Sequence, residues 1–213
     1  FEHRTGFKLG ADVGFKDYMW EALKDPAAGI NMIQTAENLA RQYGITRTQV
    51  DEFACASFAK AVAAQQRGFH AGEIVPVVSE TFELEGHVTR GIRLQGKATE
   101  VSQDTHARIS PIEVLAKLRP VYEGGVQTGG NSSALVDAAA AAVVSCGSFA
   151  RQWSQEQGRQ PLARLLAASV VGVPPATMGI GPAPAIRLLL QRTGLRLDQI
   201  DRFEINEAQG AQT

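Results

Sequence analysis

The stretch Glu123-Gly-Gly-Val-Gln-Thr-Gly-Gly-Asn-Ser-Ser133 divides the chain into two parts of different character. Its two glycine pairs and small polar residues predict a tight loop, because glycine tolerates backbone angles that other residues avoid. The alanine-rich run Ala138–Val144 follows, with the composition of a buried core segment. Helices and a hairpin are predicted before the loop, whereas strands and helices alternate after it. We therefore place a boundary near Pro120–Gly125.

Two helices are predicted early in the first part. Thr35–Tyr43 ends at Gly44, a residue that readily takes the left-handed conformation found at helix ends. Thr46 and Gln49 then have the spacing of a capping box. They open an amphipathic helix of about five turns that closes at Gly68.

A β hairpin and a short helix complete the first part. The pair Glu85-Gly86 is a plausible turn between the β-rich runs Thr81–Leu84 and Val88–Leu94. Further on, Ser110 is expected to be the N-cap of a short helix through Leu118, with a proline at the first helical position.

The second part reads as helix, strand, helix and strand. A helix is predicted over Ser148–Gln157, and Leu162–Val171 is apolar enough for a strand buried on both faces. Pro182–Arg192 is expected to form a helix stopped by Gly194, and Asp201–Ile205 a second short strand. Two strands joined through a helix predict a right-handed βαβ unit, so the fold class is α/β.

Composition excludes several classes of function. The 213 residues are 44% hydrophobic and carry a net charge of −1, so no basic face for nucleic acid is predicted. No run approaches the length of a membrane span. The two cysteines, Cys55 and Cys146, lack metal-ligand spacing, and neither a metal site nor a disulfide is expected. A cytoplasmic location is the default expectation.

Several short motifs, each weak alone, occur along the chain: Thr35-Ala-Glu-Asn38, Gln49-Val-Asp-Glu-Phe-Ala54, Glu73-Ile-Val-Pro76, Leu115-Ala-Lys-Leu-Arg-Pro120, Thr128-Gly-Gly-Asn-Ser-Ser133, Asp137-Ala-Ala-Ala140, Met178-Gly-Ile-Gly-Pro182 and Asn206-Glu-Ala208. Their order and spacing resemble those of the thiolase family, and the resemblance covers essentially the whole chain.

The resemblance implies a thiolase-like fold, with layered α/β halves and an inserted loop domain, only partly covered by this chain. Residues 1–122 would be the loop domain, a CoA-binding lobe. Residues 123–158 would end the N-terminal α/β half with a linker helix, and residues 159–213 would begin the C-terminal half. Thiolases are usually homodimers or homotetramers, and the same is expected here.

The implied activity is acyl transfer in fatty acid metabolism, including β-oxidation. A thiolase-type enzyme cleaves 3-ketoacyl-CoA with CoA, or condenses two acyl-CoA, through a cysteine acyl-enzyme. Coenzyme A and acyl-CoA would be substrates, and no bound cofactor is required. The alternatives are a non-catalytic relative that binds CoA thioesters or lipids, an inactive fragment, and, ranked low, a condensing enzyme of the ketoacyl-synthase type.

The resemblance also assigns site residues. Asn206 matches the asparagine that holds a water in an oxyanion hole, although an asparagine there could simply cap a helix. Asn31 stands where biosynthetic members carry histidine, and Gln209 where many carry an aromatic residue. The residues implied in binding CoA or substrate are Asn31, Met32, Tyr122, Ser133, Met178, Ala208 and Gln209. The methionines could instead be plain core residues, and Ser133 a turn residue.

Neither cysteine lies in the family's nucleophile motif, and both are interpreted as small buried residues. The four histidines, His3, His70, His87 and His106, match no catalytic motif and are interpreted as surface or loop residues. The nucleophilic cysteine and the later histidine and cysteine motifs are expected outside these residues. This stretch alone is therefore expected to be inactive.

Overall fold

Two helices joined by a tight turn form the framework of the chain. A computed structural model describes residues 16–213. Helix α2 (Met32–Tyr43) ends at Gly44, whose φ of 66° is left-handed, and α3 (Arg47–Gln66) follows at once. Thr46 and Gln49 form the capping box that the sequence predicts. Both boundaries are therefore set by local residue chemistry.

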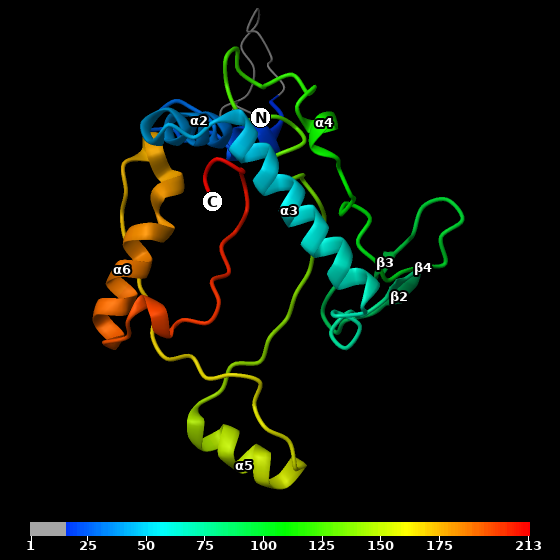
Figure 1. Ribbon diagram of the computed structural model, residues 1–213. Helices are drawn as coiled ribbons and strands as arrows, with labels where there is room; N and C mark the ends of the chain where they lie inside the picture. Colours follow the sequence, from blue (N-terminus) through cyan, green and yellow to red (C-terminus); the bar gives the residue numbers. More distant parts are fainter. Residues whose placement is uncertain (1–15) are drawn as a thin grey trace, which may run out of the picture.

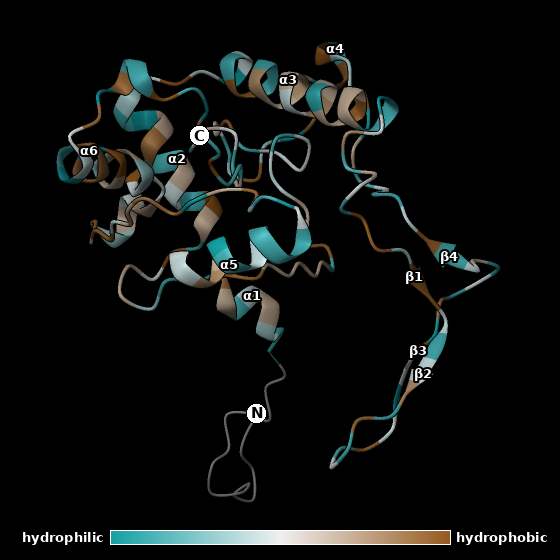
Figure 2. Cartoon of the chain, turned by 90° about the horizontal axis from the view of Figure 1, so that it is seen from below, coloured by the Kyte–Doolittle hydropathy of each residue, from teal (hydrophilic) through white to brown (hydrophobic). Residues whose placement is uncertain are grey.

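The β-rich residues form a narrow antiparallel arm. Strand β2 (Glu80–Phe82) pairs with β3 (Arg90–Ile92), and β1 (Val77–Val78) pairs with β4 (Glu100–Val101). Gly86 turns with a φ of 77°, so the predicted hairpin is confirmed. Figure 2 shows this arm extending away from the helices.

The remaining elements are helices or single helical turns, and Figure 1 shows α5 set apart on long extended connections. Helix α4 differs from its prediction, because Pro111 is the N-cap and Ser110 makes no capping bond. Helices α5 and α6 begin and end within one residue of their predicted bounds. The elements are α1 (Tyr18–Ala22), α4 (Ile112–Leu115), α5 (Gly147–Gln157), η1 (Pro175–Ile180), α6 (Pro182–Thr193) and η2 (Leu197–Gln199).

The two strands predicted around α6 are wrong. Leu162–Val171 and Asp201–Ile205 are extended but pair with no strand in the described residues. Both nevertheless lie beside α6, since Ser169 donates a hydrogen bond to the Ala185 carbonyl oxygen at 2.8 Å and a hollow of about 270 Å³ joins both segments to the helix. A strand exists only with a neighbour that completes its backbone ladder, and composition does not supply one.

The core lies elsewhere than the alanine-rich run suggests. Val143 is 96% exposed and Val144 85%, so the prediction that this run is buried is wrong. The buried apolar cluster consists of Ala40, Val50 and Ala211, which join α2, α3 and the C-terminal segment.

Polar side chains are as deeply buried as this apolar cluster. The Glu37 carboxylate in α2 accepts the backbone N–H groups of Val126 and Gln127 at 2.8–3.0 Å. Asp51 in α3 accepts hydrogen bonds from the Arg47 guanidinium and the Asn131 amide, each at 2.8 Å. Hydrogen bonds to charged groups contribute about 1.5–3 kcal/mol each. The loop 125–131 is therefore held on both helices by buried carboxylates.

Substituting Gly125 by alanine tests how closely this loop packs on α2. A Cβ at Gly125 would lie 2.4 Å from Glu37 Oε1 and 2.9 Å from the Tyr122 carbonyl oxygen. We expect Gly125→Ala to lower the free energy of unfolding by about 1–3 kcal/mol, because the loop or the carboxylate must shift. Gly129→Ala is the control, since a Cβ there meets nothing within 4 Å. Equal urea midpoints for the two variants would contradict this packing.

Candidate functional site

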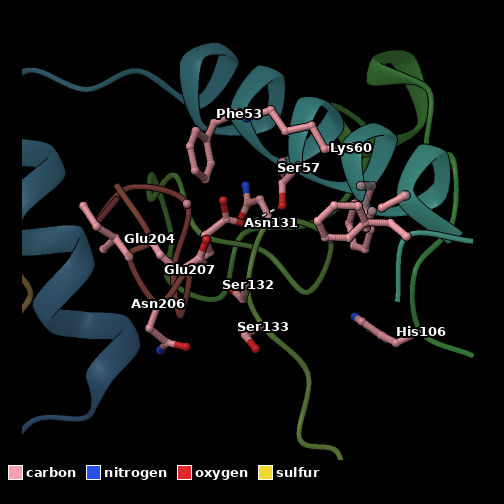
Figure 3. Close-up of a pocket in the computed structure, with 18 of the residues that line it drawn as sticks. Phe53, Ser57, Lys60, His106, Asn131, Ser132, Ser133, Glu204, Asn206 and Glu207 are labelled. Atoms are coloured by element: carbon pink, nitrogen blue, oxygen red, sulfur yellow. Dashed lines mark hydrogen bonds between the residues drawn. The ribbon is translucent and has the colours of Figure 1, made fainter. Parts of the chain in front are cut away.

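A cleft of about 670 Å³ lies between α3, the loop 130–133 and the segment 202–210. Figure 3 shows Ser57 of α3 pointing toward Glu207 of the C-terminal segment, with Asn131 of the loop beside them. Two predicted site residues, Ser133 and Asn206, line the cleft although they are far apart in sequence. The fold thus brings together the serine implied in pantetheine binding and the asparagine implied in catalysis.

Backbone hydrogen bonds hold the two sides of the cleft in register. The Ser133 N–H donates to the Ala208 carbonyl oxygen at 3.0 Å, and the Gly210 N–H donates to the Asn131 carbonyl oxygen at 2.9 Å. Ser132 and Gln209 form an isolated antiparallel bridge between these contacts. Ala208 and Gln209 are therefore close to the cleft through their backbone, whereas neither lines it.

Asn206 lies in extended chain rather than at the start of a helix. The predictions that Asn206 follows a strand and that it caps a helix are therefore wrong. The residue is exposed, so its amide is available to a bound molecule or water. A neutral amide can hold a water beside a developing negative charge, which is the chemistry of an oxyanion hole.

The other predicted binding residues gather near α2, outside the residues that line this cleft. The Asn31 Nδ2 group donates to the Tyr122 hydroxyl at 2.8 Å, and Asn31 Oδ1 caps α2. Met32 opens α2 and is half-buried. Met178 lies in η1, which packs on α2, and is 38% exposed, so the interpretation as a plain core methionine is wrong for it.

One end of the cleft is basic. Lys60, Arg67, His70 and His106 all line it; Lys60 lies in α3, and Arg67 is the C-cap of that helix. This group was missed from the sequence, although Ser57, Lys60, Ala61, Ala64 and Arg67 have the spacing of one helical face.

An aromatic ring adjoins this basic end. His106 and Phe58 have ring centroids 5.8 Å apart, and the Arg108 guanidinium lies 5.9 Å from the Phe58 centroid. His70 and His106 are thus part of the cleft surface, whereas His87 is exposed in the arm. His3 lies outside the described residues.

At the opposite end, two carboxylates, Glu204 and Glu207, and one guanidinium, Arg202, line the cleft near Asn206. The Ser57 hydroxyl in α3 donates a hydrogen bond to Glu207 Oε2. Because the two carboxylates outnumber Arg202 there, a phosphate group entering the cleft is favoured at the Lys60 and Arg67 end.

The cysteines differ in environment, and neither lines the cleft. Burial raises the pKa of the Cys55 thiol, with smaller contributions from Asp51 and other carboxylates. Cys146 is exposed, so its interpretation as a buried residue is wrong. A hydrogen bond with the Ser148 hydroxyl, and others with backbone N–H groups at the start of α5, lower the pKa of Cys146. The described residues contain no cluster of histidine, cysteine and acidic side chains able to hold a metal.

The chain belongs to the thiolase family. Residues 1–148 match the family model for the thiolase N-terminal domain, and residues 159–213 match the thiolase C-terminal domain. It is 41% identical to Beta-ketothiolase BktB of Cupriavidus necator, over 98% of this chain and 49% of that protein. It is 37% identical to acetyl-CoA acetyltransferase of Syntrophomonas wolfei, over 99% of this chain and 50% of that protein.

Solved structures agree with the sequence comparison. Human mitochondrial 3-ketoacyl-CoA thiolase in complex with CoA matches with a TM-score of 0.77 and 32% identity, over 98% of this chain and 48% of that one. Bacillus anthracis acetyl-CoA acetyltransferase matches with a TM-score of 0.75 and 36% identity, over 100% of this chain and 50% of that one. The predicted fold, part of a thiolase fold, is therefore confirmed. The chain spans about half the length of these relatives. No helix in the described residues is long and apolar enough to cross a membrane.

The two thiols are expected to differ in reactivity. Cys146 is exposed with a lowered pKa, whereas the pKa of Cys55 is raised. Cys146 therefore forms its thiolate at lower pH, and we expect it to react with iodoacetamide at least about tenfold faster near neutral pH. Peptide mass spectrometry over time measures both rates, and Cys146→Ser should leave only the slow reaction. Equal rates in the folded protein, or faster labelling of Cys55, would contradict this expectation.

Proposed function

We propose that this protein is an acyl-CoA acyltransferase of the thiolase type, which cleaves 3-ketoacyl-CoA with CoA or condenses two acyl-CoA. The observation that supports this most directly is the meeting of Asn206 and Ser133 on one cleft. Relatives named acetyl-CoA acetyltransferase and 3-ketoacyl-CoA thiolase support it further. If the protein binds CoA but does not convert the substrate, the non-catalytic alternative is favoured.

The charges of the cleft suggest how a CoA thioester would lie. Its phosphates would bind the end with Lys60 and Arg67, away from the carboxylates of Glu204 and Glu207. The pantetheine arm would pass Ser133, whose hydroxyl suits an amide. The thioester would then approach Asn206, where a water held by the amide donates to the oxygen as it gains negative charge.

The covalent step requires a thiolate that carries the acyl group. The environments of Cys55 and Cys146 do not suit this role, because neither thiol lines the cleft. We therefore assign the acyl-enzyme to neither of them. The roles proposed within this chain are substrate binding and stabilisation of the thioester oxygen.

The residues near α2 are proposed to act as a supporting wall. Asn31 and Tyr122 are hydrogen-bonded at 2.8 Å, so each orients the other. Met32 and Met178 lie on neighbouring elements, α2 and η1. We propose that this group borders the acyl and pantetheine end, and that Gln209 in place of an aromatic residue alters the acyl groups accepted.

We further propose the domain limits 1–122, 123–158 and 159–213, a homodimeric or homotetrameric assembly, and a cytoplasmic role in fatty acid metabolism. The family-model limit at residue 159 supports the last division. Many apolar side chains are exposed in the described chain, which supports association. The similarity to peroxisomal thiolases of mouse and rat offers a different location, which fractionation of the source cells would distinguish.

Asn206→Ala in the full-length protein tests the catalytic proposal. We expect kcat for 3-ketoacyl-CoA thiolysis to fall about 10²–10³-fold with little change in KM, because the amide acts on charge that develops only in the transition state. Loss of the 3-ketoacyl-CoA absorbance measures the rate. Asn38→Ala is the control, since Asn38 bonds the Ala176 carbonyl oxygen away from the cleft. Similar kcat values for Asn206→Ala and the unaltered protein would refute the role.

Arg67→Ala tests the proposed direction of CoA in the cleft. We expect KM for acyl-CoA to rise about fivefold to tenfold, and less at high ionic strength, because an exposed guanidinium-phosphate contact is screened by salt. The KM for the matching acyl-pantetheine, which lacks the nucleotide, should not change. Arg90→Ala in the β arm provides the control. An equal rise for both substrates would show that Arg67 does not contact the nucleotide.

A further inference from the structure

The segment that carries Asn206 forms hydrogen bonds only through the residues that follow Asn206. Residues 201–206 form no hydrogen bond with other described residues, whereas residues 207–210 form several. Asn206 is itself exposed, and its amide has no partner within residues 16–213. Residues 204–206 border α6, but the hydrogen bonds that fix this segment come from the residues that follow Asn206.

Glu207, the next residue, reaches across the cleft to α3. Its Oε2 atom accepts a hydrogen bond from the Ser57 hydroxyl, which comes from 150 residues earlier in the chain. Figure 3 shows Ser57 pointing from α3 into the cleft, where Glu207 and Asn206 lie. A bond between a hydroxyl and a carboxylate is stronger than one between neutral groups. The side chain next to Asn206 is therefore attached to a helix.

The same bond controls where the charge of Glu207 lies. A carboxylate released from Ser57 could accept a hydrogen bond from the amide of neighbouring Asn206, which would compete with a bound water. It could also approach the thioester oxygen and oppose the negative charge that develops there. Holding the carboxylate on α3 avoids both effects.

We propose that Ser57 is a positioning residue for the acyl-transfer reaction. It holds Glu207 on α3, and so keeps Asn206 in place and the carboxylate away from the reacting thioester. This inference rests on the proposed function, because it assumes the role of Asn206. Ser57 also connects α3, which is proposed to bind CoA, to the segment that carries the Asn206 amide.

Ser57→Ala provides the first test, measured as thiolysis by the full-length protein. We expect kcat to fall about tenfold with little change in KM, because a displaced catalytic group slows the chemical step. Ser57→Thr retains the hydroxyl and should restore most of the rate. Thr48→Ala, at an exposed position of α3, is the matched control and should leave kcat unchanged. Thermal unfolding midpoints show that each variant is folded.

A double-mutant cycle with Glu207→Ala separates positioning from independent effects. If Ser57 acts through Glu207, the double variant should be no slower than the slower single variant. The proposal would be overturned if the two single reductions in kcat multiply in the double variant, or if Ser57→Ala has a normal kcat. If Asn206→Ala is slow while Ser57→Ala is normal, the proposed function stands and only this inference fails. A full-length protein that contains the nucleophilic cysteine and still shows no thiolysis would refute both.

Discussion

The buried carboxylate of Glu37 anchors the loop on which the candidate site depends. Residues 125–131 belong to no helix or strand, so their buried backbone N–H groups need another acceptor. Glu37 provides it by accepting the N–H groups of Val126 and Gln127, and Gly125 lies so close to it that a Cβ would collide. An apolar residue at position 37 would leave those donors unpaired, which costs about 1–3 kcal/mol for each group.

The cleft follows from this anchor through a short chain of contacts. Asp51 binds the Asn131 amide, and the Asn131 backbone carbonyl accepts the Gly210 N–H. Ser133 then binds Ala208 through its backbone, which places the segment of Asn206 opposite α3. A helix, a loop and a C-terminal segment thus meet without a shared sheet. The position of the site depends on polar contacts more than on the small apolar cluster.

The division of charge gives the cleft a direction. Lys60 and Arg67 occupy one end, whereas two carboxylates and Arg202 occupy the end near Asn206. A thioester with a charged nucleotide at one end and a neutral acyl group at the other suits this polarity. This polarity is the basis of the proposed orientation of a CoA thioester in the cleft.

The sequence by itself determined the end of α2, the start of α3, the limits of α5 and α6, the hairpin and the family. Gly44, Gly194 and the capping box of Thr46 act on neighbouring residues, so their effects can be inferred locally. Only the tertiary structure decided that Leu162–Val171 lacks a pairing strand and that Val143 is exposed. It also decided which polar groups meet across the chain, including Glu37 with the loop and Ser57 with Glu207. Such contacts join residues far apart in sequence, and local propensity carries no information about a distant partner.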